Sequence, residues 1–303
     1  MYNVREYDKR IRFAMALLLK KRDGSYIIVG NKQERTLKFL YKTVSGRVVL
    51  KLLTRPVVSK VTGKVLDSRI SAFAAKSAIK KRKIETEMLE KSKFKSYNDF
   101  FTRKLKEGGR PVDMLPETLI SPCDSKLSAY TIGEDSSFVI KGTPYTVNDL
   151  LGGDRIYKEY IGGTCLIFRL AVDDYHRYCY FDNGKKGDNK YLKGILHTVH
   201  PIVVGEYNIY KRNCREYTVM DTENFGKVVQ VEVGAMMVGR IKNFHGAHSF
   251  KRGEEKGMFE FGGSTIVLLL KENAAVLDAD ILQNSANGVE TIVKYGEKIG
   301  HKA

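Results

Sequence analysis

Cysteine is scarce in this chain, with four residues in 303, and their spacing forms neither a CxxC metal pair nor a dense disulfide framework. Such unpaired cysteines are typical of a reducing, intracellular compartment. Long apolar runs are also absent, because no stretch reaches the roughly 18 residues that a membrane-spanning helix needs. The first five residues begin no secretory signal, since the apolar stretch 13–19 is short and no cleavage region follows it. We therefore expect an intracellular protein that does not span a membrane.

Positive charge is plentiful and unevenly distributed. The formal net charge is +17. Residues 1–110 hold 29 Lys and Arg against 10 Asp and Glu, whereas residues 111–303 hold 23 against 25. A basic first third favours polyanionic partners, either nucleic acid or the anionic face of a bilayer, although a solvated surface would show the same excess.

The order of patterns along the chain predicts an α+β protein. Residues 11–31 predict a hairpin, because two apolar runs flank an Asp-Gly turn. From about residue 37 to 89, apolar residues recur at helical spacing with cations between them, which suits a helix in a membrane interface or one packed on a core. After Pro111, short β-rich runs alternate with turns. We predict a basic, partly helical, membrane-associating region over 1–93 and an antiparallel, sandwich- or barrel-like β-sheet domain over 94–303.

The most informative segment is Gly262-Gly263-Ser264-Thr265, which precedes five apolar residues, 266–270. The apolar run predicts a fully buried strand, and glycines allow a strained backbone before it. A hydroxyl held there could attack the carbonyl of Gly263 and cut its own chain. The same residues also suit a plain turn into a strand, with Ser264 as its cap.

Two other segments hold groups that a serine nucleophile needs. Asp124 lies in a predicted turn, and His176 follows the predicted strand 165–172. In a nucleophile relay, a histidine takes the serine proton and an acid fixes the tautomer of that histidine. The relay requires that the fold brings the three segments together.

Five motifs in order give the chain a family resemblance. They are Phe-Phe-Thr-Arg at 100–103, Ser-Pro-Cys-Asp at 121–124, Asp-Tyr-His-Arg at 174–177, Val-Glu-Val-Gly-Ala-Met-Met-Val-Gly-Arg-Ile at 231–241 and Phe-Gly-Gly-Ser-Thr at 261–265. On these motifs, the chain resembles the phosphatidylserine decarboxylases, pyruvoyl-dependent enzymes made as self-processing proenzymes. The resemblance covers roughly residues 95–271.

The resemblance implies a role for each matching residue. Ser264 would cut the Gly263–Ser264 bond and become a covalent pyruvoyl group, and fragments 1–263 and 264–303 would stay associated. Asp124 would orient the relay histidine, and His176 would act in processing, in decarboxylation, or in both. The pyruvoyl group would form a Schiff base with phosphatidylserine, which would leave as phosphatidylethanolamine after losing CO₂.

One position departs from the family pattern. Many members carry a second histidine three residues after the first, and here that position is Cys179. His176 would then do both jobs, or His197 or His200 would stand in for the missing histidine. The sequence leaves open whether Cys179 is inert and whether the protein is a homodimer.

The implied substrate also sets the expected partner and location. A lipid substrate requires a site that opens at a bilayer, and the basic first third would attract an anionic surface. We therefore expect a peripheral protein on the cytoplasmic side of the cell membrane. We expect no metal site, because His245 and His248 lie in a glycine-containing loop with no carboxylate at ligand spacing.

Two other functions fit parts of the pattern. The first is a pyruvoyl-dependent decarboxylase of a soluble or nucleoside-linked amino acid. The second is a nucleic-acid-binding protein, in which aromatic residues near Arg103 stack on bases. The rings concerned are Phe94, Tyr97, Phe100 and Phe101. Because the chain has no glycine-rich phosphate loop, RNP signature or zinc spacing, we expect no nucleic-acid partner.

Overall fold

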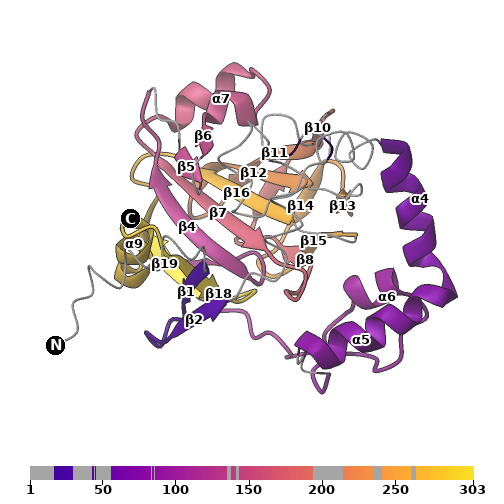
Figure 1. The fold of residues 1–303 in the computed structure, drawn as a ribbon. Coiled ribbons are helices and arrows are strands. Elements are labelled where there is room, and N and C mark those ends of the chain that lie inside the picture. The colour runs from indigo at the N-terminus through magenta and orange to yellow at the C-terminus, as the bar shows by residue number, and fades with distance from the viewer. Residues whose placement is uncertain are drawn as a thin grey trace.

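The computed structural model describes residues 17–29, 43, 45, 56–82, 84, 86–134, 138–140, 143–193, 214–234, 241–260 and 264–303. Within these ranges the protein is mixed α+β and consists mostly of sheet, which confirms the predicted class. An 11-stranded sheet dominates, and two three-stranded sheets and one two-stranded sheet accompany it (Figure 1).

The main sheet runs in the order β14-β9-β11-β12-β16-β7-β4-β18-β1-β2, and β10 pairs with β11 beside this path. The strands along this path are β14 at His248–Phe250, β9 at Gly184–Lys186, β11 at Arg215–Thr222, β12 at Gly226–Gly234, β16 at Ser264–Leu270, β7 at Thr164–Leu170, β4 at Ser125–Thr131, β18 at Glu290–Val293, β1 at Leu17–Lys20 and β2 at Tyr26–Val29, with β10 at Lys190–Leu192. Between described strands, β1 and β18 pair in parallel and every other pairing is antiparallel.

The smaller sheets and the helices surround this sheet. The strands are β13 at Ile241–Asn243, β15 at Glu255–Phe259 and β8 at Arg177–Cys179; β17 at Ala275–Leu277, β19 at Lys298–Lys302 and β3 at Thr118–Ile120; and β5 at Phe138–Ile140 with β6 at Thr143–Tyr145. The helices are α4 at Pro56–Asp67, α5 at Ala72–Arg82, α6 at Tyr97–Phe101, α7 at Val147–Leu150 and α9 at Ala279–Ala286, with short 3-10 helices η1 at Arg69–Ser71 and η2 at Arg155–Tyr160.

Strand β16 lies inside the main sheet and positions the predicted nucleophile. All seven of its residues are buried, as the apolar run 266–270 predicts. It pairs with β12 on one side and β7 on the other, and Ser264 lies opposite Gly234 and Leu170. Leu170 is the last residue of β7. This register therefore sets Ser264 beside the loop by which the chain leaves β7.

The predicted hairpin near the N-terminus is confirmed for residues 17–29. Strands β1 and β2 pair across a turn that contains Asp23 and Gly24, and Gly24 has the positive φ of 84° that favours glycine. Because β1 also pairs with β18, this hairpin extends the main sheet instead of standing apart from it. The end strands β14 and β2 have no pairing with each other among the described strands, so a closed barrel is not formed there. The domain boundary at 93/94 stays a prediction.

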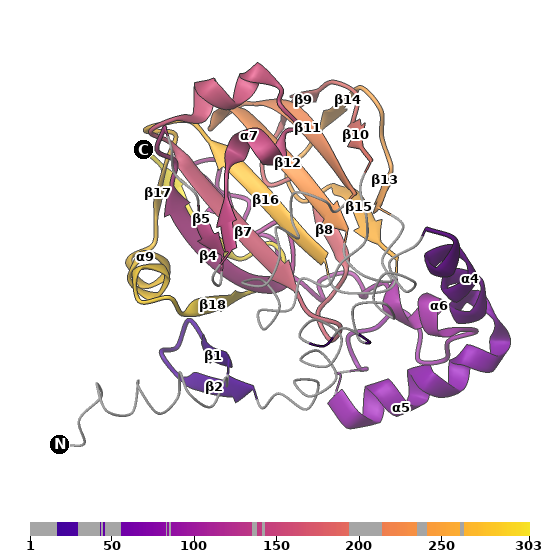
Figure 2. The same ribbon diagram turned by 45° about the horizontal axis from the view of Figure 1, so that its top comes forward.

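Helices α4 and α5 stand to one side of the sheet, with α6 next to them (Figure 2). A small apolar cluster joins them, in which Ala75 of α5 packs with Phe100 and Phe101 of α6. Most of the predicted helical pattern before residue 56 lies outside the described residues. No described helix is both long enough and apolar enough to cross a membrane.

The burial of α6 removes the basis for a base-stacking surface. Phe100 and Phe101 are fully buried and Tyr97 is nearly so. Phe94 packs edge-on against Phe100, with ring centroids 5.4 Å apart. These rings therefore serve the core and offer no exposed platform for bases.

Candidate active site

The site begins at Ser264, the first residue of β16, whose side chain is 0% exposed. His176 lies in the loop after β7, directly before β8. Its Nδ1 is 3.2 Å from the Ser264 Oγ, and its Nε2 is 2.9 Å from the carbonyl oxygen of Ala171. A carbonyl oxygen only accepts hydrogen bonds, so Nε2 carries the proton and Nδ1 offers its lone pair to the hydroxyl. The pair is therefore arranged as a nucleophile and its general base.

The surroundings of His176 keep the imidazole neutral. Burial lowers its pKa and the positive charge of Arg103 lowers it further, to about 3, against the opposing effect of the Ala171 hydrogen bond. A base must be unprotonated before it can accept a proton. His176 therefore remains in its proton-accepting form throughout the physiological pH range.

Helix α6 closes the site over the imidazole. Its first turn is capped by Ser96, whose Oγ accepts the backbone N–H of Asp99 at 3.0 Å. The helix delivers Phe101, whose ring centroid lies 3.9 Å from that of His176. The Phe-Phe-Thr-Arg motif thus shields His176 from water, a role that its sequence pattern did not indicate.

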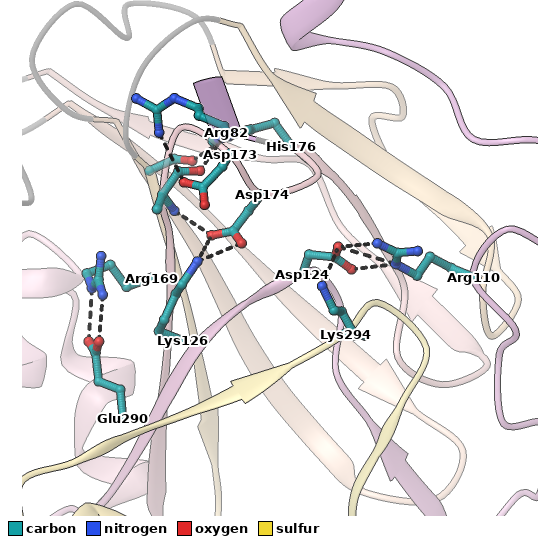
Figure 3. A network of polar contacts seen from close by, with 12 residues as sticks. Arg82, Arg110, Asp124, Lys126, Arg169, Asp173, Asp174, His176, Glu290 and Lys294 are labelled. Carbon is teal, nitrogen blue, oxygen red and sulfur yellow. Dashed lines mark hydrogen bonds and ion pairs between the residues drawn. The ribbon is translucent and has the colours of Figure 1, made fainter. Parts of the chain in front are cut away.

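Asp124 is buried, but it contacts groups other than His176. Its carboxylate accepts hydrogen bonds from Arg110 Nη2 at 2.8 Å and from the backbone N–H of Tyr295 at 2.9 Å, and Lys294 Nζ is 3.6 Å away (Figure 3). Burial raises the pKa of Asp124, but the Arg110 hydrogen bond and the Lys294 charge outweigh burial and leave the pKa below its usual value.

The acid–histidine contact expected from the sequence is therefore absent between these described residues. The Ala171 carbonyl holds the imidazole in place of a carboxylate. The pattern gave no signal for Ala171, because any residue at that position supplies the same carbonyl. The catalytic role of Asp124 stays a prediction.

Cys179 is fully buried at the end of β8. Burial raises the pKa of its thiol to about 12, although a hydrogen bond with Tyr295 lowers it in part. A thiol that remains neutral does not act as a base near pH 7. His197, His200 and Gly263 lie outside the described residues, so within the described site His176 is the histidine that contacts Ser264.

The loop that carries Ala171 and His176 is held by charge pairs (Figure 3). The Asp174 carboxylate accepts the backbone N–H of Ala171 at 2.6 Å and lies 2.6 Å from Lys126 Nζ, both largely buried. Arg103 Nη2 donates to the carbonyl oxygens of Asp173 and Asp174 at 3.0 and 2.9 Å. These contacts fix the carbonyl that orients His176.

A polar pocket of about 210 Å³ opens beside this loop. Its charged and phenolic lining consists of Arg82, Arg103, Arg110, Asp124, Asp173, Asp174, Tyr175 and Lys294. Arg103 is buried, and its Nη1 has no hydrogen-bond partner among the described residues. A buried guanidinium donor left unpaired at a pocket wall is suited to an anionic oxygen of a ligand.

Comparison with known proteins identifies the family that this chain resembles. Residues 97–301 match the family model described as phosphatidylserine decarboxylase. The chain is 49% identical over 265 residues to phosphatidylserine decarboxylase proenzyme 2 of Clostridium acetobutylicum, covering 87% of this chain and 91% of that protein. It is 41% identical over 273 residues to the proenzyme of Ruminiclostridium cellulolyticum, covering 88% and 91%. It is 38% identical over 288 residues to a proenzyme of Clostridium botulinum, covering 93% and 98%.

The matched span contains the residues that build the site. Phe101, Asp124, His176 and Ser264 all lie between residues 97 and 301. The family resemblance read from the five motifs is thus confirmed. The chain belongs to the phosphatidylserine decarboxylase family.

Proposed function

We propose that this carboxy-lyase converts phosphatidylserine to phosphatidylethanolamine and CO₂ with a pyruvoyl group that it makes from its own Ser264. The observation that carries the proposal is the contact of 3.2 Å between the Ser264 Oγ and the unprotonated Nδ1 of a neutral, buried His176. The sequence has serine at position 264, the residue from which this group would form.

The first step is an acyl shift within the main chain. The Ser264 Oγ bonds to the carbonyl carbon of Gly263 and its proton passes to His176 Nδ1. The bond from that carbon to the Ser264 nitrogen breaks, and the nitrogen takes the proton back from His176. The amide has then become an ester, and His176 has returned to its neutral form.

The second step releases the fragments. A base, for which the neighbouring His176 Nδ1 is available, would take the Cα proton of residue 264 as the Cβ–Oγ bond of the ester breaks. This leaves a carboxylate on Gly263 and an unsaturated residue at 264. Addition of water and departure of ammonia then yield the pyruvoyl group. Strand β16 would remain hydrogen-bonded between β7 and β12, so fragments 1–263 and 264–303 would stay associated.

The buried start of β16 fits such a group, because His176 already faces the side chain of residue 264. A pyruvoyl carbonyl takes up a primary amine and accepts the electron pair that CO₂ leaves behind. His176 would take a proton from the substrate amine and return it to the substrate carbon after CO₂ leaves, while Phe101 excludes water. Because the thiol of Cys179 stays neutral and offers no second base, we propose that His176 serves both processing and decarboxylation.

The pocket beside the site would bind the lipid headgroup. The unpaired Nη1 of Arg103 is placed to meet the substrate carboxylate or phosphate. Arg82, at the end of α5, lines the same pocket. The headgroup would therefore enter next to the helices that stand beside the sheet.

These helices carry a surface suited to a bilayer. Ile70 and Phe73 are 88% and 84% exposed, and Val61 and Val65 of the preceding helix α4 are exposed as well. Lys64, Lys76, Lys80 and Lys81 are exposed on the same segment. Large apolar side chains among cations suit the interface of an anionic membrane. We infer peripheral binding, and the cytoplasmic side of the cell membrane is the surface that fits the basic charge.

The proposed substrate can be tested with the purified enzyme. We expect CO₂ and phosphatidylethanolamine from vesicles or micelles that contain phosphatidylserine, and no turnover of free serine or of a water-soluble nucleoside-linked amino acid. Turnover of a soluble substrate at a rate equal to or above that of the lipid would contradict the proposal. Ser264→Ala, which cannot form the group, is the matched inactive control.

A further inference from the structure

His245 and His248 lie beside the carboxylate of Glu254, which follows them in the chain by nine and six residues. The chain turns after β14, and Glu254, the residue before β15, comes to lie beside both rings. The His248 Nε2 is 2.7 Å and the His245 Nε2 is 3.7 Å from the Glu254 Oε1. The expectation of no metal site rested on the spacing of possible ligands in the sequence. The turn between β14 and β15 brings a carboxylate to the histidines in spite of that spacing.

The three donor atoms converge on one point. They all lie within 4.8 Å of one another, and the two imidazole rings are stacked with centroids 4.0 Å apart at 13°. Ligands that each sit about 2.0–2.2 Å from a Zn²⁺ ion lie roughly 3–4 Å apart in a tetrahedral site. Small side-chain rotations are therefore enough to bring these donors around one ion.

The groups behind the donors fix their orientation. The hydroxyl of Tyr180 is 3.2 Å from the His245 Nδ1, which leaves the Nε2 of that ring for a ligand. The Glu254 Oε2 accepts the backbone N–H of Lys251 at 2.9 Å, which leaves the Oε1 directed at the histidines. Metal-binding histidines and carboxylates generally have such second hydrogen bonds.

The loop that carries the histidines is also held in place. Lys186 Nζ donates to the His245 carbonyl oxygen at 3.0 Å, and Asp188 Oδ1 accepts the backbone N–H of Ala247 at 2.9 Å. Tyr180 is stacked on Phe250 of β14, with ring centroids 4.2 Å apart. The donors are thus mounted on a rigid support, which lowers the cost of ordering a metal site.

We propose that His245, His248 and Glu254 bind one divalent transition-metal ion of the Zn²⁺ class and thereby tie β14 to the start of β15. Two imidazoles and one carboxylate favour Zn²⁺, Ni²⁺ or Co²⁺ over the oxygen-preferring Mg²⁺ and Ca²⁺. The three donors are partly exposed, so water completes the coordination sphere. Because β15 leads toward Ser264 in sequence, the ion would stabilise the segment that precedes the cut.

The test is a titration of untagged, processed protein, freed of metal by a chelator, with Zn²⁺ in a calorimeter. We expect one equivalent to bind and to raise the Tm, whereas Mg²⁺ and Ca²⁺ at the same concentration do neither. His248→Ala should weaken Zn²⁺ binding more than about 100-fold, since it removes a ligand, and Tyr180→Phe should weaken it about 10-fold, since it removes only a supporting hydrogen bond.

The control is His301→Ala, because His301 is exposed and its Nδ1 faces the carbonyl of the adjacent Lys302. This variant should bind Zn²⁺ as the unaltered protein does. Circular dichroism spectra test whether each variant is folded. If His248→Ala does not fold, Glu254→Gln removes a different ligand and serves in its place. The proposal is overturned if no equivalent of Zn²⁺ binds, or if folded His248→Ala and Glu254→Gln both bind it with unchanged affinity. In those cases His248 and Glu254 form an ordinary charge pair.

Discussion

The ring of Phe101 covers the imidazole of His176, with centroids 3.9 Å apart and planes 30° from each other. Phe101 belongs to α6 and is fully buried, so the ring excludes water from one side of His176. Desolvation is the largest cause of the low pKa of His176. The helix that begins the family match thus tunes the base that faces Ser264.

Phe101→Ala should raise the pKa of His176 from about 3 toward the ordinary value near 6.5. Removing the ring admits water, which stabilises the charged imidazolium. The pKa can be followed by NMR of labelled histidine in Ser264→Ala protein, with and without Phe101→Ala. An unchanged pKa for His176 would show that Phe101 does not control its solvation.

The same shift predicts how stability depends on pH. The unfolded chain protonates His176 near pH 6.5, whereas the folded chain does so only near pH 3. Between these values the unfolded state binds more protons, so this histidine lowers the free energy of unfolding as the pH falls. The loss is at most about 1.4 kcal/mol per pH unit. Phe101→Ala should make the free energy of unfolding depend less steeply on pH in this range. The packing energy that the substitution removes does not vary with pH and is subtracted first.

His176→Gln should block or strongly slow the cut at Gly263–Ser264, because glutamine has no lone-pair nitrogen that could take the hydroxyl proton. Cys179→Ser is the matched control, since a buried neutral thiol three residues away contributes no base. Electrophoresis of freshly translated protein measures both. Full processing of His176→Gln would show that another group acts as the base. Loss of processing in folded Cys179→Ser would show that the thiol takes part.

Arg103→Lys should weaken the use of phosphatidylserine. Lysine retains the positive charge but lacks the planar guanidinium group, whose nitrogens reach both the loop carbonyls and the pocket. A hydrogen bond to a charged group is worth about 1.5–3 kcal/mol, so kcat/KM should fall roughly 10- to 100-fold. A rise in KM with nearly constant kcat, measured on material shown to be fully processed, would separate substrate binding from defective processing. An unchanged KM would contradict a headgroup contact.

The paired change Ile70→Ser and Phe73→Ser should reduce binding to anionic vesicles while leaving processing complete. Burying each side chain in the interface is worth about 1.5–3 kcal/mol, so at least ~10-fold weaker binding is expected. Tyr191→Ser is a control, because Tyr191 is exposed on β10, which belongs to the main sheet. Vesicle sedimentation at low and moderate salt measures all three proteins. Equal binding would place the membrane contact elsewhere.

Local patterns predicted the parts of the structure that depend on local chemistry. The apolar run 266–270 predicted the buried strand that begins at Ser264, and the Asp-Gly turn predicted the β1–β2 hairpin. The pairing of His176 with Ser264 came from the family resemblance, because these residues lie 88 positions apart. The attachment of the hairpin to β18 depends on the whole sheet, which no local pattern specifies.

The contacts that the sequence did not predict are decided by competition among distant groups. Asp124 was expected beside the histidine, but Arg110 and Lys294 offer it positive charge, and the Ala171 carbonyl supplies the acceptor that His176 needs. Glu254 follows His245 by nine residues, and the turn between β14 and β15 brings its carboxylate to both histidine rings. The contacts of Asp124 depend on distant parts of the chain, whereas those of the two histidines depend on the shape of this turn.

The most direct test of the central claim is intact mass spectrometry of two purified proteins, the unaltered one and the Ser264→Ala variant. The unaltered protein should separate under denaturation into fragments 1–263 and 264–303. The smaller fragment should be lighter by one ammonia than a chain beginning with serine, and it should react with a carbonyl reagent. Ser264→Ala should give one uncut chain. A fully active unaltered protein that is one unbroken chain with serine at 264, or two fragments from Ser264→Ala, would contradict the account.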